Sequence, residues 1–202
     1  EGKFSFRYNS DKSSVGYLIT AQNKPYFLIL DKGENIEIRG NNLLETETIK
    51  TISGKQNIAF TEYGAEHPRR EQALSAWRYL QKIYILDSLF SNKSTPKKAI
   101  ETETSRIKKE DKDFINSLDP KSYIAWYLPI RRLVSDVSII AQYRAEEIPS
   151  AISAFRKLDY TDERLYRSGI LRDAIESHFW LIENSGRTLD SVFVEMKISI
   201  DS

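Results

Sequence analysis

Cysteine is absent from this sequence of 202 residues, and histidine occurs only twice. Without a thiol the chain cannot form a disulfide, use cysteine as a nucleophile or bind zinc through thiolates. The two histidines, His67 and His178, lie far apart in the sequence, and one histidine alone makes a poor metal site. We therefore expect no metal site, no cofactor and no cysteine-based catalysis in this chain.

The sequence also lacks long apolar runs and a clear excess of charge of either sign. The apolar runs are short, as at residues 26–30, and none approaches the roughly 18 residues that a membrane-spanning helix needs. With 30 basic and 29 acidic residues the net charge is +1, and the basic residues cluster only as pairs with acidic residues nearby. Nucleic-acid-binding proteins usually carry a basic excess or a basic stripe. We expect neither a membrane span nor a nucleic-acid partner.

The first part of the sequence has the period of β-strands. Phe4, Phe6 and Tyr8 alternate with polar residues, as in a half-buried strand. Short runs of β-branched and aromatic residues follow, separated by turn residues such as Asn23 and Gly33. The strands expected are residues 4–8, 15–20, 26–30, 35–39 and 48–52. Five short antiparallel strands with tight turns predict a small sandwich or half-barrel.

From residue 55 onward the apolar residues repeat with the period of an α-helix. The helices expected are residues 69–90, 95–118, 123–138, 148–158, 168–183 and a last one from residue 189 onward. Ser122 can cap the third of these helices, and Pro129 should kink or break it. The sequence therefore predicts the α+β class, with a small N-terminal antiparallel β-sandwich or half-barrel over residues 1–54 followed by an all-α helical domain over residues 55–202.

The last predicted helix presents an apolar face without a stop signal after it. Leu189, Val192, Phe193, Met196 and Ile200 follow one another at spacings of 3, 1, 3 and 4. No glycine, asparagine or proline follows them, although helices commonly end at one of these residues. We expect the helical domain to be truncated at its C-terminus, and we expect this face to pack against a neighbouring copy in a homodimer or to fray.

Several segments resemble one family of proteins. The pattern G-x-F-x-F occurs at residues 2–6, and F-L-I followed by G-E-x-I occurs at residues 27–36. Residues 52–57 resemble a G-S-x-x-N junction into a first helix. The longer segments PKSYIAWYLPIR at residues 120–131 and LYRSGIL at residues 165–171 are more specific. Together they resemble the β domain and helical region that precede the thioredoxin fold in secreted thiol–disulfide oxidoreductases of Bacteroidetes.

The resemblance implies an accessory or scaffold region of such an enzyme, with no catalytic activity of its own. The C-x-x-C pair that carries the redox chemistry of the family has no counterpart in this chain, so no catalytic residue carries over. The partner would be a client protein or the parent protein's own thioredoxin domain. The location would be the periplasm, either free or as a membrane-anchored lipoprotein.

A stand-alone extracytoplasmic module that binds a small ligand or a glycan is the alternative hypothesis. Exposed aromatic side chains on the sheet, such as Tyr8, Tyr17 or Tyr26, would favour it. A hydrolase is a third hypothesis, which no spacing of a nucleophile, a base and an acid supports.

Trp126, Arg131 and Arg132 are the residues that we expect at a binding surface. Aromatic and arginine side chains are enriched at the energetic centres of protein interfaces. The other interpretation is a core helix in which the arginines pair with Asp136 or another acid. The spacing leaves both interpretations open.

Two further groups of polar residues are expected to be structural. His178 shares a helix face with Leu171 and Ile182, which favours a hydrogen-bonded histidine at the edge of the core over a catalytic or metal-binding one. Five acidic residues lie in the second predicted helix: Glu101, Glu103, Glu110, Asp111 and Asp113. They are mixed with lysine and arginine, which predicts a solvated face with i,i+4 ion pairs rather than a carboxylate site.

Overall fold

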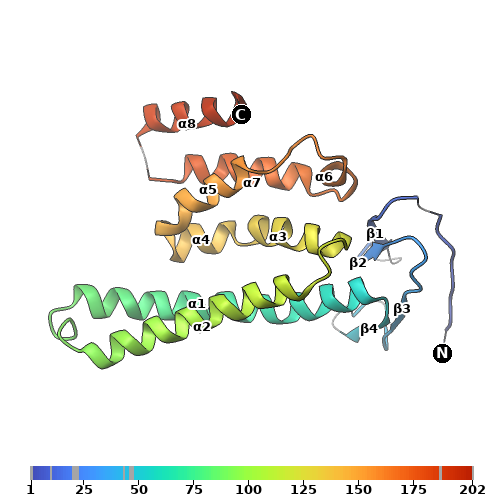
Figure 1. Cartoon of the computed structure of the whole chain (residues 1–202), viewed down its shortest axis with the longest axis horizontal. Coiled ribbons are helices and arrows are strands. Elements are labelled where there is room, and N and C mark those ends of the chain that lie inside the picture. Colours follow the sequence, from blue (N-terminus) through green and yellow to red (C-terminus); the bar gives the residue numbers. More distant parts are fainter. Residues whose placement is uncertain are drawn as a thin grey trace.

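The structure is a computed structural model that describes residues 2–9, 11–19, 23–42, 44–45, 48–186 and 188–201. Its strands are β1 (Ser14–Ile19), β2 (Pro25–Leu30), β3 (Glu37–Arg39) and β4 (Lys50–Ser53). β1 pairs with β2, and β3 pairs with β4, both antiparallel. The described strands thus form two small sheets of two strands each, and both lie at one end of the molecule (Figure 1).

The predicted strand at residues 4–8 does not form. Residues 2–9 have no regular secondary structure, and the rings of Phe4 and Phe6 are exposed and stack on each other. Alternation alone cannot make a strand, because the backbone also needs the edge of a neighbouring strand to pair with. The described β region therefore has four strands rather than five.

The helices begin at Lys55. They are α1 (Lys55–Leu86), α2 (Ser94–Ser117), α3 (Tyr123–Ser135), α4 (Val137–Tyr143), α5 (Ile148–Arg156), α6 (Glu163–Arg167), α7 (Leu171–Glu183) and α8 (Leu189–Asp201). A 3₁₀ turn, η2 (Ala145–Glu147), joins α4 to α5. The predicted α+β class, with a small antiparallel β region followed by helices, is confirmed. The change from strands to helices falls at Gly54.

The two longest helices, α1 and α2, form an antiparallel hairpin that runs along the molecule (Figure 1). α3 and α4 lie along this hairpin, α5 and α7 lie beyond them, and α8 forms the outermost layer. The sheets lie at the N-terminal end of α1, whereas the turn between α1 and α2 projects at the opposite end. Among the described residues, no helix has both the length and the apolar character that crossing a bilayer requires.

Two helix boundaries differ from the prediction because proline ends neither helix. α1 begins at Lys55 rather than at residue 69, and it contains Pro68. α3 continues past Pro129, and the break comes at Asp136, before α4. Proline removes one backbone hydrogen bond, and its ring crowds the carbonyl four residues earlier. Both helices nevertheless continue, since each has buried side chains on either side of its proline.

Two polar side chains in the first turn of α1 fasten the β1–β2 hairpin to the helices. The side-chain amide of Asn57 accepts from the N–H of Ile29 at 2.8 Å and donates to the carbonyl of Ile29 at 2.8 Å, as a neighbouring strand would. Gln56 accepts from the N–H of Ile124 at 2.9 Å and donates to Asp31 at 2.5 Å. Because Ile29 and Ile124 are buried, these bonds satisfy backbone groups that water does not reach.

Apolar side chains join the β1–β2 hairpin and the helices in a common core. One cluster contains Ile29 of β2 together with buried residues of the helical region: Tyr63, Tyr123, Ile124, Tyr127, Leu128, Ile130, Leu165 and Ile170. Phe27 of β2 stacks on Phe60 of α1, with 4.3 Å between the ring centroids. A second cluster joins α4, α5, α7 and α8. The β1–β2 hairpin thus packs directly on the helices instead of forming a core of its own.

α8 packs only partly on its own chain. Val192 is buried in the second core cluster and Met196 packs against that cluster, whereas Phe193 and Ile200 are exposed. The side chain of Leu189 lies outside the described part of the chain. Part of the predicted apolar face therefore packs within its own chain. That a second copy covers the exposed part stays a prediction.

Candidate functional site

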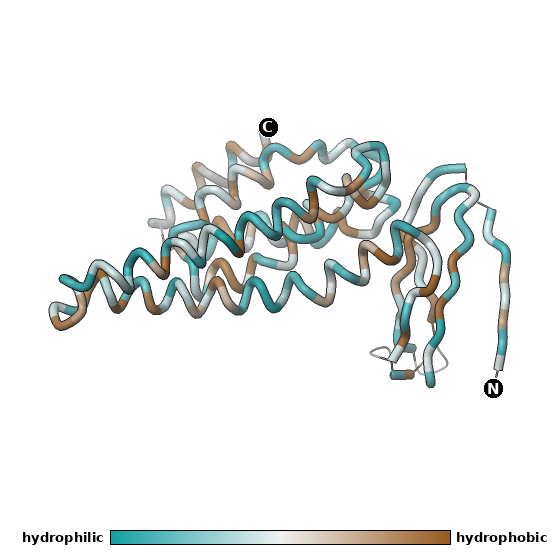
Figure 2. The backbone as a smooth tube through the Cα atoms, turned by 60° about the horizontal axis from the view of Figure 1, so that its bottom comes forward, coloured by the Kyte–Doolittle hydropathy of each residue, from teal (hydrophilic) through white to brown (hydrophobic). Residues whose placement is uncertain are grey.

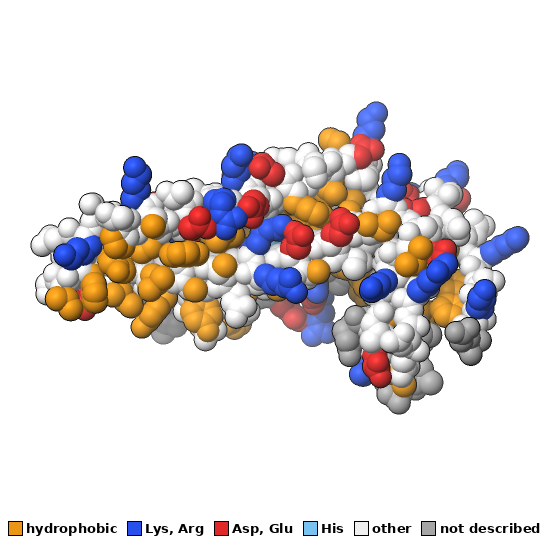
Figure 3. Space-filling model, turned by 90° about the horizontal axis from the view of Figure 1, so that it is seen from below, with side chains coloured by type: hydrophobic (Ala, Val, Ile, Leu, Met, Phe, Trp, Pro, Cys, Tyr) orange, Lys and Arg blue, Asp and Glu red, His pale blue; other side chains and the backbone are white. Residues whose placement is uncertain are grey.

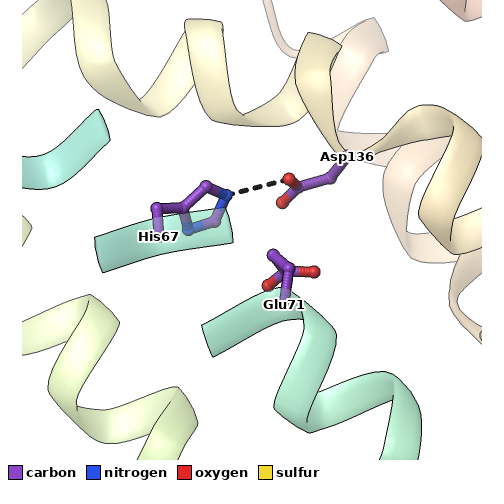
Figure 4. Close-up of side chains that lie close together, drawn as sticks. All are labelled: His67, Glu71 and Asp136. Atoms are coloured by element: carbon purple, nitrogen blue, oxygen red, sulfur yellow. Dashed lines mark hydrogen bonds and ion pairs between the residues drawn. The ribbon is translucent and has the colours of Figure 1, made fainter. Parts of the chain in front are cut away.

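A group of mostly buried ionisable side chains lies where α1 meets α2, α3 and α4, with Arg132 at its partly exposed edge. We call it the charged cluster; its members are Tyr63, His67, Arg70, Glu71, Asp111, Arg132, Asp136 and Arg144. Figure 4 shows His67 and Glu71 of α1 and Asp136 from the junction of α3 and α4, which point toward one another. Burying a charge is costly unless it is paired, so the pairing within the cluster determines what it can do.

His67 lies at the centre of the charged cluster. Its Nδ1 is 2.9 Å from Oδ1 of Asp111 on α2, and its Nε2 is 2.9 Å from Oδ1 of Asp136. An ionised carboxylate only accepts hydrogen bonds, so both ring nitrogens carry a proton in this arrangement. His67 is therefore an imidazolium held between two carboxylates.

The surrounding groups keep both His67 and Asp111 charged at neutral pH. Burial alone would lower the pKa of His67, but the hydrogen bonds to Asp111 and Asp136 outweigh it and raise the pKa to about 9. Burial alone would raise the pKa of Asp111, but the hydrogen bonds from His67 and Arg132 lower it to about 2. The pair therefore stays ionised between these two values.

Asp111 joins α2 to both α1 and α3. Its Oδ2 accepts from Arg132 of α3 at 2.8 Å and from the hydroxyl of Tyr63 at 3.3 Å, while its Oδ1 accepts from His67. A second guanidinium, that of Arg70, lies 3.6 Å from Oδ1. Burial and the charge of Asp111 raise the pKa of Tyr63, so its hydroxyl stays protonated and donates. Both carboxylate oxygens of Asp111 are thus occupied.

Glu71 extends the charged cluster toward α4. Its carboxylate forms an ion pair with the guanidinium of Arg144, and both side chains are almost fully buried. Arg144 also lies 3.5 Å from the carboxylate of Glu147. Burial and the nearby charge of Asp136 raise the pKa of Glu71, whereas Arg144 opposes this shift. A cationic partner therefore holds Glu71 in place.

His67, Glu71 and Asp136 also have the residue types of a metal site, and their ligand atoms lie within 4.8 Å of one another. A metal would need the lone pair of Nε2 of His67, but this nitrogen donates to Asp136. Glu71 is occupied by Arg144, and a guanidinium beside the site would repel a dication. The donor set therefore fits a network of ion pairs better than a metal centre.

Access to the charged cluster decides between an ion-pair network and an active site. His67, Asp111 and Asp136 are 6%, 6% and 8% exposed. Two surface depressions lie on the α1–α2 hairpin, one beside Ser94 and one beside Tyr84, and neither is lined by a member of the cluster. A catalytic acid or base must come within hydrogen-bond reach of its substrate. With only 6% of its surface exposed, His67 is poorly placed to reach a substrate.

Known proteins give no guide to the role of this cluster. No family model matches the chain, and no curated protein or solved structure does so. The similarity of the sequence to the thioredoxin-like family therefore stays a hypothesis, and the function has to be argued from the cluster and from the surface.

Trp126, Arg131 and Arg132 have different surroundings in the structure. The guanidinium of Arg164 lies 4.5 Å from the ring centroid of Trp126, in a cation–π contact. Arg132 binds Asp111 in the charged cluster, whereas Arg131 is exposed. Arg132 thus pairs with an interior acid, and docking through Trp126 or Arg131 stays a prediction.

The structure agrees with the prediction for His178 and corrects the one for Asp111. His178 is buried, and its Nδ1 lies 3.4 Å from the hydroxyl of Tyr160, so it is the core histidine that the sequence predicts. The prediction that Asp111 lies on a solvated face is wrong. Asp111 follows Ile100 and Ile107 at spacings of 11 and 4, which places it on the buried face of α2.

We expect the contribution of His67 to stability to depend on pH. Its pKa rises on folding from 6.5 to about 9, so the stabilisation is complete below pH 6.5 and is lost as the pH rises through about 9. A shift of this size corresponds to about 3 kcal/mol. Urea denaturation of the wild type and His67→Gln at about pH 6 and about pH 10 measures it. The difference in unfolding free energy between the two proteins should shrink at the higher pH.

His178→Gln is the matched control for this experiment. Burial, together with the charge of Arg156, lowers the pKa of His178. Its contribution to stability should therefore grow, not shrink, as the pH rises through the ordinary value of a histidine. If His67→Gln destabilised the protein equally at both pH values, His67 would not be an imidazolium in the folded chain.

Proposed function

We propose that this chain is a non-catalytic accessory region that acts as a rigid scaffold. The observation that carries the proposal is the closure of the charged cluster. Both ring nitrogens of His67 and both carboxylate oxygens of Asp111 are engaged within the chain. Groups paired in this way are not free to exchange a proton with a substrate. They serve instead to hold α1, α2 and α3 together.

Further ion pairs between helices support the scaffold role. Arg144, which follows α4, pairs with Glu71 of α1. Glu147 in η2 lies 2.9 Å from Lys108 of α2 and 3.5 Å from Arg78 of α1. A buried ion pair offsets its desolvation cost only in a well-defined geometry. The buried pair of Arg144 and Glu71 therefore favours one fixed position of α1 relative to α4, whereas the partly exposed pairs of Glu147 contribute less.

The resemblance supports a more specific form of this proposal. In the family that residues 120–131 and 165–171 resemble, a region of this kind precedes a thioredoxin fold. On this basis the chain positions a thioredoxin-like thiol–disulfide oxidoreductase domain, or the client protein of that domain, in the periplasm. Since the chain has no cysteine, the redox chemistry would belong entirely to the other domain.

We expect the purified chain to have no thiol–disulfide oxidoreductase activity. Exchange proceeds through a mixed disulfide, which a chain without cysteine cannot form. Reduction of insulin by dithiothreitol should therefore run at the same rate with and without the chain, and turnover above the protein-free rate would contradict the proposal. The gene sequence beyond the codon for Ser202 tests the more specific form, which requires a C-x-x-C pair there.

A ligand- or glycan-binding module is the second candidate, and Tyr17 favours it because its ring is 55% exposed on β1. Tyr8 and Tyr26 are engaged within the chain: the hydroxyl of Tyr8 donates to the carbonyl of Asp31 at 2.6 Å, and that of Tyr26 lies 3.4 Å from Thr51. Binding of the wild type to a glycan array, with loss of binding in Tyr17→Ala, would favour this module over the scaffold.

A further inference from the structure

The end of the α1–α2 hairpin is unusually apolar for a part of a chain that projects into solvent. We call residues 79–98 the hairpin tip; it comprises the end of α1, the following turn and the start of α2. It lies at the opposite end of the molecule from the sheets (Figure 1). Leu86 and Leu89 are 81% and 73% exposed, and Tyr79 and Ile85 are 66% and 56% exposed. Large apolar side chains exposed together usually mark an interaction site.

The turn that presents these side chains is held by its own hydrogen bonds. The N–H groups of Phe90 and Ser91 donate to the carbonyl of Asp87 at 3.0 and 2.8 Å, and the N–H of Leu89 donates to its carboxylate at 2.8 Å. The ring of Phe90 folds back toward Tyr84, with 5.3 Å between the centroids. Phe90 is thus drawn into the hairpin, while Leu89 is left pointing into solvent.

The exposed apolar side chains at the end of α1 lie on more than one face of the helix. Tyr79 and Leu86, seven residues apart, share one face, and Ile85 lies on another. Ile85 and Leu86 are consecutive in the helix, so their side chains point about 100° apart. On the face drawn in Figure 3, hydrophobic side chains gather over this end of the hairpin, and in Figure 2 the tube at the turn includes stretches in the colour of hydrophobic residues. A single partner helix covers one stripe of a helix. An apolar layer into which the tip inserts covers all of its sides.

The hairpin tip is also positively charged. It contains four lysines, Lys82, Lys93, Lys97 and Lys98, and one acidic residue, Asp87, which gives a net charge of +3 in a chain whose total is +1. Within the described residues these lysines form no ion pair. Farther along α2, by contrast, the basic side chains pair with acids, as Arg106 does with Glu103 and Glu110. The tip therefore combines exposed apolar side chains with cationic charge that is not neutralised.

We propose that the hairpin tip inserts into the surface of a lipid bilayer that contains anionic lipids. Apolar side chains flanked by lysine are the composition that binds at such an interface, where the leucines enter the acyl boundary and the lysines meet the headgroup charge. A second copy of the chain is disfavoured as the occupant, because pairing two tips would bring two charges of +3 together. This contact is independent of the scaffold role, which rests on the charged cluster.

α8 provides a comparison within the same chain. Phe193 and Val194 are 66% and 59% exposed, so α8 also presents apolar side chains to solvent. The sequence over residues 189–201, however, contains three acidic residues and one lysine, a net charge of −2. An anionic surface attracts the hairpin tip and repels α8.

Flotation of the purified chain with vesicles tests the proposal. The chain should float with vesicles of equal parts phosphatidylglycerol and phosphatidylcholine, and raising the salt to about 0.5 M should release most of it because the attraction is screened. Vesicles of phosphatidylcholine alone should bind it much less. The double variant Leu86→Glu, Leu89→Glu should reduce the bound fraction about tenfold or more, whereas the matched variant Phe193→Glu, Val194→Glu should bind like the wild type.

Both variants alter exposed residues, so circular dichroism should confirm that each remains helical. Equal flotation of the tip variant and the wild type would overturn the proposal, as would failure of the wild type to float with anionic vesicles. Analytical ultracentrifugation without lipid tests whether the tip instead binds a second copy of the chain. A dimer that the tip substitutions abolish would show that the tip binds a second copy and not a bilayer.

Discussion

Replacing His67 with alanine should lower the free energy of unfolding by about 3–5 kcal/mol. The substitution removes the cation that lies between Asp111 and Asp136. Asp111 keeps the guanidinium of Arg132, but buried Asp136 loses its cationic partner. A buried charge that has lost its partner is costly, because neither water nor another protein group replaces the interaction. Urea denaturation at pH 7 measures the loss.

A double variant separates the effect of charge from the effect of packing. His67→Leu together with Asp136→Leu removes one cation and one anion, and it leaves the ion pair of Asp111 and Arg132 in place. Replacing a buried ion pair by apolar side chains of similar volume is often neutral or stabilising. The double variant should therefore lose less stability than either single variant. If its loss equalled the sum of the two single losses, the cluster would not be the pairing network described.

Replacing Asn57 with alanine should cost about 2–6 kcal/mol, because it leaves two buried backbone groups unsatisfied and each costs roughly 1–3 kcal/mol. These groups are the N–H and the carbonyl of Ile29, a residue with 0% exposure. The variant should also loosen the β1–β2 hairpin from α1. Thermal denaturation gives the loss of stability, and hydrogen exchange of the amides in β1 and β2 reports the local loosening.

Asn184→Ala is the matched control for this variant. The side-chain amide of Asn184 also donates to a backbone carbonyl, that of Trp180 at 2.8 Å, but Asn184 is exposed. Water can replace that bond, so the control should lose less than about 1 kcal/mol. Equal losses in the two variants, or unchanged hydrogen exchange in β1 and β2 of Asn57→Ala, would contradict the role of Asn57.

Periodicity and turn residues predicted the elements that local interactions determine. The β1–β2 hairpin and helices α2, α5 and α8 form close to the predicted ranges, and the Ser122 hydroxyl caps α3 by accepting from the N–H of Ala125 at 3.3 Å. α1 starts earlier than predicted, and it continues through Pro68 because side chains on both sides of this proline are buried. Tertiary packing overrides such a local signal.

The charged cluster could not be predicted, because its members lie far apart in the sequence. Asp111 and Asp136 lie 44 and 69 residues after His67. One local signal exists on α1. His67, Glu71 and Leu74 follow one another at spacings of 4 and 3, so the two polar residues lie on the same face of the helix as an apolar residue. This spacing indicates that His67 is buried. Only the packing of α1 against α2 and α3 shows which charges it meets.

The protonation state of His67 tests most directly the central claim that the cluster is a closed network of charges and not a reactive site. The chain has two histidines, so nitrogen-15 NMR of the imidazole rings can observe each of them. At about pH 7.5 both ring nitrogens of His67 should be protonated, because its pKa is about 9, whereas His178, whose pKa is lowered by burial, should be neutral. Added zinc should leave the His67 signals unchanged. An unprotonated ring nitrogen on His67 at this pH, or a shift of its signals with zinc, would contradict the account.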